Sequence, residues 1–346
     1  MLFVPVSGAF GMGEYARSLS IAQAAKRRWP AAEIRFILSR QAPYAARAPF
    51  PATLLDSSPT FHSAAVIRLI ESFRPHAVIF DNAGRTAQLR AGRRAGAAVV
   101  YISARARQRR KAFRWRWMRL IDEHWIAYPE FIAGRLNILE RFKLKMLRRP
   151  VVRYLDVILS RDGVSGPDTI LKRLDLDTDS YALIVPGGGT GHPGANDAAQ
   201  TFMNAADVIA KSGTPVVFVG PAVRSSSGAQ LRCFDSLPQG DLAELMNGAR
   251  LIVCNGGSTL LQGIGCGRAC VGVPIAKDQA ARISRCVMAG VAVAASLDSA
   301  SIAHVAAGLL DDSAGRLALK RRADELGLAD GVKIGLAALQ RLLETK

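Results

Sequence analysis

Short apolar runs alternate with helical periodicity in the first part of the chain. Uninterrupted apolar runs are typical of strands buried in a parallel sheet, and apolar residues at three- and four-residue spacing are typical of amphipathic helices. This pattern predicts strands at 2–6, 33–38, 77–80 and 97–102, and helices at 14–28, 64–73 and 86–95. The alternation predicts a parallel sheet covered on both faces, with right-handed crossovers and a site at the carboxyl ends of its strands.

The alternation stops in the basic region 105–153 and restarts after a polar, turn-rich stretch at 159–174, which we interpret as a linker with a short helix. Further strands are predicted at 181–185, 215–219, 251–254 and 270–273, with helices at 196–212, 241–247 and 260–266; a basic helix at 334–343 closes the chain. We therefore expect an α/β protein of two facing Rossmann-like domains with an interdomain cleft. The expected domains are 1–160 and 161–333, followed by a C-terminal helix within 334–346.

Composition and net charge indicate which kinds of partner the protein is expected to bind. The chain has 346 residues, enough for two cores, and a formal net charge of +18, which favours polyanionic partners such as nucleic acid, anionic lipid or a phosphorylated substrate. Its five cysteines form no CxxC pair, so free thiols in a reducing cytoplasm are expected. Met1 leads into an apolar strand without a basic segment, so no signal peptide is expected, and no apolar run is long enough to span a bilayer.

Glycine-rich turns follow two predicted strands of the second half, at 186–192 (PGGGTGH) and 255–259 (NGGST). Such turns let backbone N–H groups approach an anion, and a helix N-terminus adds a favourable dipole. Neither turn matches the P-loop or the dinucleotide fingerprint. Two such turns in one half predict a ligand that carries a pyrophosphate.

A resemblance to a known family rests on DLAELM at 241–246 and ARLIVCNGGSTL at 249–260, continued by Gly267, Val273-Pro274 and Asp278-Gln279. These motifs resemble the nucleotide-binding half of GT-B glycosyltransferases. The types that they resemble are the peptidoglycan N-acetylglucosaminyltransferase and the nucleotide-sugar hydrolase of pseudaminic acid synthesis. The stretch 11–19 (GMGEYARSL) is similar to the opening loop of that hydrolase, and Asp81 at a strand end matches too.

The resemblance implies that the donor nucleotide lies on the second domain. Gly187, Gly188 and Gly189 would face the pyrophosphate, Ser258 and Thr259 would donate to phosphate, and the loop 233–237 would meet the base. The residues that the resemblance assigns to substrate or nucleotide binding are Gly11, Gly13, Arg17, Gly187, Gly188, Gly189, Thr190, Phe234, Asn255, Gly256, Gly257, Ser258, Thr259, Gln262, Asp278 and Gln279.

Two positions depart from the family. Gln262 stands where an acid usually accepts bonds from the ribose hydroxyls, and an amide offers weaker, uncharged bonds. Glu14 stands where the family often has a histidine base. A buried carboxylate can serve as a general base, although an acid at a helix N-terminus is also favoured without catalysis. Asp81 and His192 are the other catalytic candidates, and His192 could equally bind phosphate or lie on the surface.

A basic aromatic segment occupies 105–119, which contains no acid between Arg105 and Arg119; basic and apolar residues are interleaved again at 135–153. A solvated helix with its tryptophans in the core is the simplest interpretation, but two tryptophans two residues apart cannot share one narrow helix stripe. Basic residues with Trp and Phe are also typical of membrane interfaces and of single-stranded nucleic-acid sites. No nucleic-acid module accompanies them, so we expect an anionic membrane surface rather than nucleic acid. The expected membrane residues are Arg110, Lys111, Phe113, Arg114, Trp115, Arg116 and Trp117.

The function that these features favour is metal-independent transfer of a sugar from a nucleotide-sugar, with UDP as the expected nucleotide, to a hydroxyl of a lipid-linked acceptor. The protein would lie at the cytoplasmic face of the membrane and use no cofactor. The acidic run 175–179 lacks the Gly and the final acid of a calcium loop, so no metal site is expected. Nucleotide-sugar hydrolysis, and a non-catalytic lipid- or nucleic-acid-binding protein on the same fold, remain alternatives.

Overall fold

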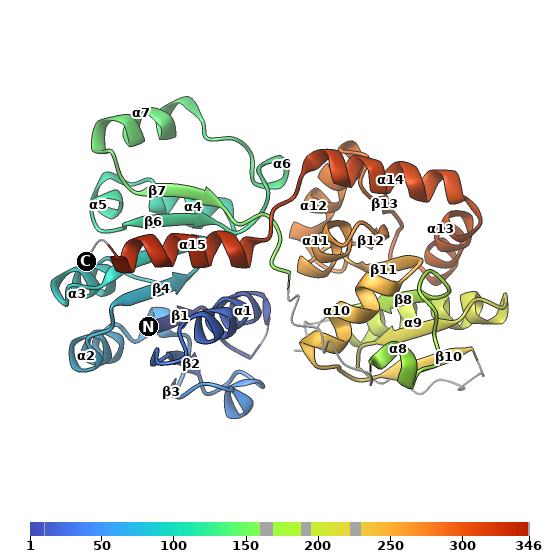
Figure 1. Ribbon diagram of the computed structural model, residues 1–346, viewed down its shortest axis with the longest axis horizontal. Coiled ribbons are helices and arrows are strands. Elements are labelled where there is room, and N and C mark those ends of the chain that lie inside the picture. The colour runs from blue at the N-terminus through green and yellow to red at the C-terminus, as the bar shows by residue number, and fades with distance from the viewer. Residues whose placement is uncertain (10, 160–168, 188–194, 222–229, 345–346) are drawn as a thin grey trace. The chain divides into compact units, whose positions relative to one another are not determined.

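The computed structural model describes residues 1–9, 11–159, 169–187, 195–221 and 230–344 (Figure 1). The chain divides into two compact units. Unit 1 consists of Met1–Ile158 and Ala329–Lys346, and unit 2 consists of Leu159–Leu328. The chain therefore leaves unit 1 once and returns to it, so that the C-terminal helix packs in the same unit as the N-terminal strand.

Within the described residues, unit 1 holds a seven-stranded sheet in which all paired neighbours run parallel, in the order β3-β2-β1-β4-β5-β6-β7. The strands are β1 (Leu2–Pro5), β2 (Arg35–Ser39), β3 (Ala52–Leu55), β4 (Ala77–Asp81), β5 (Ala98–Ser103), β6 (Glu123–Ile126) and β7 (Val151–Tyr154). The predicted strands of this half are confirmed with small shifts at their ends. β3, β6 and β7 were not predicted.

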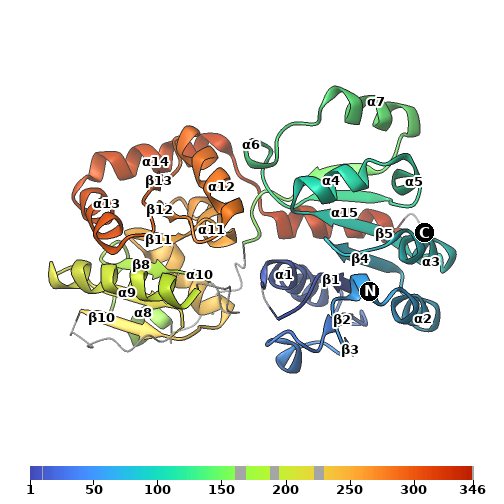
Figure 2. The same ribbon diagram turned by 180° about the vertical axis from the view of Figure 1, so that it is seen from behind.

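Helices cover both faces of this sheet (Figures 1 and 2). The helices of unit 1 are α1 (Gly13–Arg28), α2 (Ser63–Phe73), α3 (Thr86–Arg94), α4 (Ala106–Ala112), α5 (Trp115–Met118), α6 (Glu130–Ala133), α7 (Ile138–Leu147) and α15 (Gly331–Glu344). Alternate side chains of β1 enter different layers, as strand geometry requires: Phe3 packs with α1 and α15, whereas Leu2 and Val4 pack with α2 and α3. Two short 3₁₀ helices, Ala45–Arg47 and Pro59–Phe61, lie in the connections.

Unit 2 holds a six-stranded parallel sheet, counted over its described residues, in the order β10-β9-β8-β11-β12-β13. Its strands are β8 (Ala182–Val185), β9 (Val216–Val219), β10 (Leu231–Phe234), β11 (Leu251–Asn255), β12 (Ala269–Val273) and β13 (Val293–Ala294). Its helices are α8 (Ile170–Arg173), α9 (Ala195–Lys211), α10 (Gln239–Gly248), α11 (Ser258–Gly265), α12 (Lys277–Met288), α13 (Ser299–Asp311) and α14 (Ser313–Leu326).

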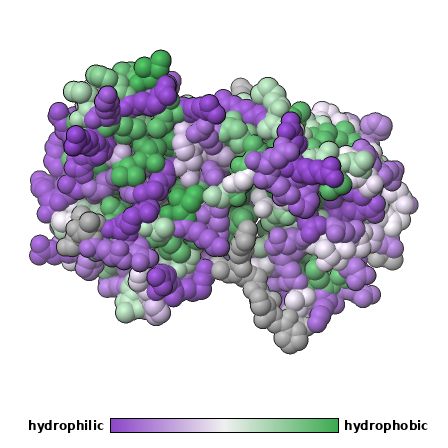
Figure 3. Space-filling view, turned by 45° about the horizontal axis from the view of Figure 1, so that its top comes forward, coloured by the Kyte–Doolittle hydropathy of each residue, from purple (hydrophilic) through white to green (hydrophobic). Residues whose placement is uncertain are grey.

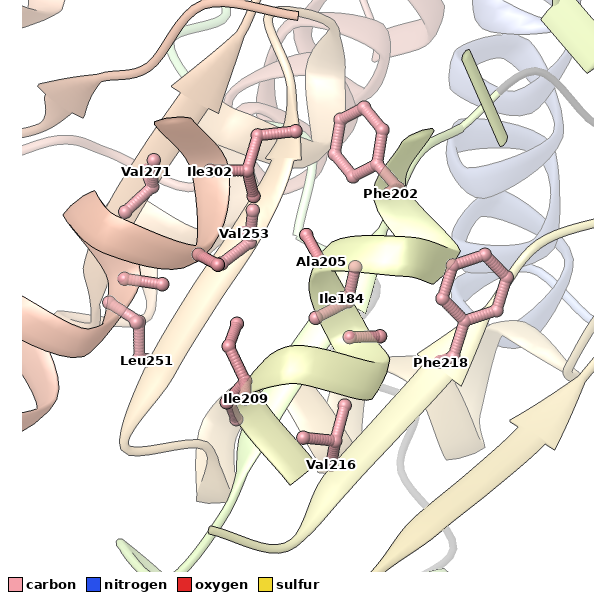
Figure 4. Close-up of a cluster of buried hydrophobic side chains, with 14 of the residues drawn as sticks. Ile184, Phe202, Ala205, Ile209, Val216, Phe218, Leu251, Val253, Val271 and Ile302 are labelled. Atoms are coloured by element: carbon pink, nitrogen blue, oxygen red, sulfur yellow. The ribbon is translucent and has the colours of Figure 1, made fainter. Parts of the chain in front are cut away.

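The core of unit 2 is built from strands rich in β-branched residues. Ile184, Val253 and Val271 come from three neighbouring strands and pack against Phe202 of α9 and Ile302 of α13 (Figure 4). Strands of this kind, buried on both faces, produce the continuous apolar runs seen in the sequence. The predicted α/β class with two parallel-sheet units is confirmed.

Strand order reverses once in each sheet. In unit 1 the chain adds β2 and β3 on one side of β1 and then crosses to β4 on the other side; in unit 2 it crosses in the same way from the β8 side to β11. Loops that leave such a switch point in opposite directions open a crevice at the carboxyl ends of the strands, where ligands of open α/β sheets bind. The topology therefore predicts ligand sites at the carboxyl ends of β1 and β4 in unit 1 and of β8 and β11 in unit 2.

Candidate functional site

The switch point of unit 2 brings the two predicted glycine turns together. Asn255, the last residue of β11, donates from Nδ2 to the carbonyl oxygen of Pro186 at 2.7 Å, and its Oδ1 accepts the N–H of Gly257 at 2.7 Å. Gly187 has φ +73°, and a Cβ there would lie 2.0 Å from Nδ2 of Asn255. Glycine is therefore required at 187 both for its backbone conformation and for the approach of Asn255.

A second amide fixes the turn from the other side. Oε1 of Gln279 accepts the N–H of Gly256 at 3.2 Å and the N–H of Ile275 at 3.0 Å, and so joins the turn after β11 to the turn after β12. Arg282 donates to the carbonyl oxygen of Gly256 and forms an ion pair with Asp278 at 3.3 Å. The turn before α11 is thus held by side chains of α12.

The turn leads into a helix whose N-terminus has no side-chain cap. Gly257 is the N-cap residue of α11 and carries no side chain, and the side chain of Ser258 is exposed. The first N–H groups of a helix have no partner within the helix and carry a partial positive charge. Together with the Gly187 turn, this geometry is suited to binding phosphate oxygens through the backbone.

Several predicted residues of unit 2 prove to have structural tasks. The side chains of Asn255 and Gln279 form the hydrogen bonds described above with backbone groups of the protein. Phe234 ends β10 at the edge of the sheet, and its carbonyl oxygen accepts the N–H of Gly220. Of the stretch 233–237 that was predicted to meet the base, Cys233 and Phe234 belong to β10, which pairs with β9. Gly188, Gly189, Thr190 and His192 lie outside the described residues.

The switch point of unit 1 contains a buried ion pair. Arg17 of α1 donates from Nε and Nη2 to the two carboxylate oxygens of Asp81, at 2.8 and 2.6 Å, and Ser18 adds a hydroxyl contact at 3.4 Å. Asp81 is fully buried at the end of β4, and Arg17 is 7% exposed. Burial raises the pKa of Asp81 to about 6, against the opposing effect of Arg17.

The structure favours a structural role for Asp81, which the sequence proposed as a catalytic base. Its exposed fraction is zero, and both of its oxygens are occupied by a bidentate guanidinium. A base must lie within hydrogen-bond reach of the proton that it removes, which a fully enclosed carboxylate does not. The pair instead anchors α1 to β4, and Arg17, predicted to bind substrate, is one half of that anchor.

Glu14 is the acid of this region that remains accessible. It lies in the first turn of α1, whose N-cap residue Met12 provides no side-chain cap, and its side chain is 16% exposed. Oε1 accepts from Nδ2 of Asn82 at 2.8 Å, and Arg105 lies 3.9 Å away. Asn82 has φ +52°, a conformation that Asn tolerates, and its Oδ1 accepts the N–H of Ala104. Asn82 therefore holds Glu14 against the ends of β4 and β5.

Asn82 and Ser18 contact the site but were not predicted as site residues. The signal that could have found Asn82 is its position directly after a buried strand that ends in an acid. Gly11, with φ +84°, and Gly13 lead into α1, and a Cβ at either position would meet nothing within 4 Å. Glycine is therefore favoured at position 11 by its backbone conformation, whereas the structure gives no steric reason for glycine at position 13.

The basic aromatic segment folds differently from the prediction. Phe113 and Trp117 are 3% and 1% exposed, so their assignment to a membrane surface is wrong. Trp117 packs edge-on against Tyr101 and donates to Thr86, and Phe113 packs against His124. Because α5 is a short helix that begins at Trp115, Trp117 can enter the core while Trp115 stays 38% exposed.

The basic residues of this segment differ in their exposure. Lys111 is half-buried, donates to the carbonyl oxygen of Gly84 and lies 4.2 Å from the Trp117 ring centre, so it is held by the protein. Arg110, Arg114 and Arg116 are exposed. Over the described part of the chain, His, Cys, Asp and Glu do not gather in any group of three that could hold a metal. No described helix has the length and apolar character needed to cross a membrane.

Comparison with known proteins finds likeness in structure but not in sequence. No family model matches the chain, and no curated protein matches it. Three solved structures align over nearly the whole length. Spinosyn forosaminyltransferase SpnP has 13% identity and a TM-score of 0.67, covering 99% of this chain and 98% of its own. MurG of Acinetobacter baumannii has 14% identity and a TM-score of 0.61, covering 98% and 99%.

The third structure, from Listeria monocytogenes and assigned as a UDP-N-acetylglucosamine 2-epimerase, has 14% identity and a TM-score of 0.63, covering 100% of this chain and 97% of its own. At such identities the likeness establishes the fold alone. That fold is the two-unit GT-B architecture of glycosyltransferases, and both units of this chain take part in it. The same architecture occurs in transferases and in a protein assigned as an epimerase, so the fold alone does not determine the reaction.

Proposed function

We propose that this protein transfers a sugar from a nucleotide-sugar, UDP-linked, to the hydroxyl group of an acceptor. The observation that carries the proposal is the uncapped N-terminus of α11 beside the Gly187 turn, at the switch point of unit 2. Asn255 links the two turns, and Gln279 fixes the second one from α12. A rigid pair of turns that presents backbone N–H groups suits a pyrophosphate better than a single phosphate.

In the proposed reaction the acceptor oxygen attacks the anomeric carbon, the bond from that carbon to the phosphate oxygen breaks, and the nucleoside diphosphate departs. The negative charge that develops on the leaving pyrophosphate would be stabilised by the N–H groups of Ser258 and Thr259 and by the α11 dipole. This assignment makes the transfer metal-independent. Gln262, one turn further along α11, would meet the ribose with an amide, where the glycosyltransferases that this stretch resembles usually have an acid.

Glu14 would take the proton of the acceptor hydroxyl. It is partly exposed, is oriented by Asn82, and lies at the carboxyl end of the unit 1 sheet. The buried pair of Arg17 and Asp81 would keep the first turns of α1 in place during the reaction. The acceptor that we propose is lipid-linked, and the protein would work as a peripheral protein on the cytoplasmic face of a membrane.

The proposal is tested by nucleotide binding. Thermal shift and calorimetry with UDP, GDP, CMP, dTDP and their sugar conjugates should give stabilisation by one nucleotide diphosphate and its sugars. Gly187→Ala should weaken that binding at least about tenfold, since the new methyl group displaces Asn255. Gly213→Ala is the matched control, because Gly213 has φ +93° but open space around it. Failure of every nucleotide to bind would overturn sugar transfer and leave a non-catalytic protein.

Nucleotide-sugar hydrolysis is the second candidate. Two observations favour it: the base position carries a carboxylate, which can activate water, and the same architecture occurs in a protein assigned as an epimerase, an activity that needs no acceptor. Water would then replace the acceptor hydroxyl, and the free sugar would be released. A rate of sugar release that no acceptor changes would favour hydrolysis, whereas release that depends on an acceptor would favour transfer.

A further inference from the structure

Helix α7 (Ile138–Leu147) presents four of its six apolar side chains to solvent. Ile138, Leu139, Phe142 and Met146 are 79%, 59%, 54% and 64% exposed. Positions 138, 142 and 146 follow one another at four-residue spacing, and 139 lies beside them, so the four side chains form one stripe along the helix. An exposed helix of a water-soluble protein normally turns such a stripe toward its core.

The side of α7 opposite the stripe faces the protein, and it carries Glu140 together with the half-buried Leu144 and Leu147. Glu140, on the opposite side from the stripe, is buried and accepts from Nε and Nη2 of Arg109 at 3.0 and 2.7 Å. The same arginine donates to the carbonyl oxygens of Ala133 and Gly134, and Asn137 caps the helix in a reciprocal arrangement with Glu140. Polar bonds thus hold α7 with its apolar stripe turned outward.

The exposed charges of α7 are positive. Arg141 and Lys145 are exposed and flank it on one side, and Arg148 follows the helix. Lys143 donates to the carbonyl oxygen of Phe113, and its Nζ lies 5.8 Å from the ring centre of Trp115, which brings that exposed ring beside α7. The acid of the helix, Glu140, is neutralised by Arg109. In Figure 3, apolar atoms lie among hydrophilic ones at the upper left, over the part of unit 1 that carries α7.

We infer that α7 is a membrane-docking helix that lies in the interface of an anionic bilayer, with Ile138, Leu139, Phe142 and Met146 among the acyl chains. Arg141 and Lys145 then meet the lipid phosphates. A helix of ten residues is about 15 Å long and can lie in the interface but cannot span the bilayer. A basic rim around an apolar stripe fits anionic lipid.

The charges also make a second copy of this chain an unfavourable partner for α7. A second copy of this chain docked through α7 would bring Arg141 and Lys145 against the same cations of its partner, where like charges destabilise the contact. The inference stands on α7 and its surroundings and does not depend on sugar transfer. Membrane binding can therefore succeed or fail independently of nucleotide binding.

Flotation of the full-length protein with vesicles tests the inference. The protein should float with vesicles of phosphatidylglycerol and phosphatidylcholine and much less with phosphatidylcholine alone, and high salt should weaken binding. Ile138→Gln/Phe142→Gln/Met146→Gln should reduce the partition coefficient at least about tenfold. The control Phe61→Gln/Leu317→Gln/Met288→Gln removes exposed apolar side chains elsewhere and should bind as the natural protein does.

The basic rim has its own variant pair. Arg141→Gln/Lys145→Gln should weaken binding to the anionic vesicles by about fivefold for each charge removed. Arg68→Gln/Arg90→Gln, which removes two exposed arginines on α2 and α3, should change it far less. Circular dichroism and thermal unfolding of each variant establish that the fold is retained, and UDP binding should be unchanged in all of them.

Penetration is measured with an added tryptophan, and its signal is the difference from the natural protein, whose four tryptophans give the background. The fluorescence that Phe142→Trp adds should shift to the blue with anionic vesicles and be quenched by brominated acyl chains, whereas the fluorescence that Phe61→Trp adds should show neither change. The inference is overturned if the natural protein does not bind anionic vesicles, or if the α7 triple variant binds them as well as the natural protein. A dimer in sedimentation velocity that the triple variant dissolves would assign the stripe to a second copy and overturn it as well.

Discussion

Asn255 and Pro186 are joined by a 2.7 Å hydrogen bond from the Asn255 amide to the Pro186 carbonyl oxygen. The two residues are 69 positions apart in the chain, and each follows or ends a central strand of unit 2. The bond makes one structure of two turns that the sequence presents separately. Any ligand that contacts both turns therefore depends on Asn255 without touching its side chain.

Asn255→Ala should lower the free energy of unfolding and weaken nucleotide binding together. The substitution leaves the Pro186 carbonyl and the Gly257 N–H without their partner, at a cost of about 1–3 kcal/mol for a buried group. Urea unfolding and calorimetry with UDP measure the two effects. Asn204→Ala is the control, because Asn204 bonds to Gln200 on the exposed face of α9. Unchanged UDP affinity in Asn255→Ala would separate the turns from the ligand.

The buried pair of Arg17 and Asp81 should behave as a coupled unit. Asp81→Leu leaves a buried guanidinium unpaired, and we expect a loss of about 3–5 kcal/mol in unfolding free energy. Arg17→Met/Asp81→Leu should be clearly more stable than the sum of the two single changes predicts. The exposed pair of Arg322 and Glu325 gives the comparison cycle, with a coupling below about 1 kcal/mol. Additive effects at Arg17 and Asp81 would contradict the anchoring role.

His124 should make the protein less stable in acid. Burial, reinforced by Arg109, lowers its pKa from 6.5 to about 3. Below pH 6.5 the unfolded chain binds a proton there that the folded protein does not, so this contribution to stability is present above pH 6.5 and falls until about pH 3. Between pH 7.5 and pH 4.5 the loss should be roughly 2 to 3 kcal/mol.

The measurement compares the natural protein with His124→Gln by urea unfolding at both pH values. The comparison is needed because Asp81 acts in the opposite direction: its raised pKa, about 6, lets the folded state bind a proton before the unfolded state does as the pH falls. That stabilisation is present at low pH and is lost as the pH rises through 6. A gap between the two proteins that does not change with pH would show that His124 has the same pKa in the folded and the unfolded protein.

Much of the fold could be predicted because most central strands are buried on both faces and therefore appear as apolar runs. β6 could not be predicted from such a run, since it opens with Glu123 and His124. Both are buried because Glu123 pairs with Arg153 of β7 and His124 bonds to Ser103 of β5. Those partners lie in neighbouring strands, and only the folded sheet reveals that the polar groups are satisfied.

Parts of the site that depend on local sequence could be predicted, and parts that depend on distant partners could not. The turns at 187 and 256 were found because glycine chemistry is local, and the structure explains both by close contacts with Asn255, Gln279 and Ile283. The role of Asp81 was missed because its partner, Arg17, lies 64 positions away, and a carboxylate at a strand end has the same sequence whether it is free or paired. The different exposure of Trp115 and Trp117 could not be predicted, because it depends on a short helix that begins at Trp115 and that the basic pattern does not indicate.

Glu14→Gln should abolish most turnover while leaving nucleotide binding intact. The amide can still accept from Asn82 through its oxygen, so the fold should be retained, but it cannot take a proton. We expect a fall in kcat of about 10²–10⁴-fold with little change in KM for the UDP-sugar that binds most tightly. Initial rates of UDP release measure this. Glu130→Gln, an exposed acid in the first turn of α6 that pairs with Arg135, should keep the natural rate. A Glu14→Gln protein with the natural turnover would exclude Glu14 as the base of the reaction.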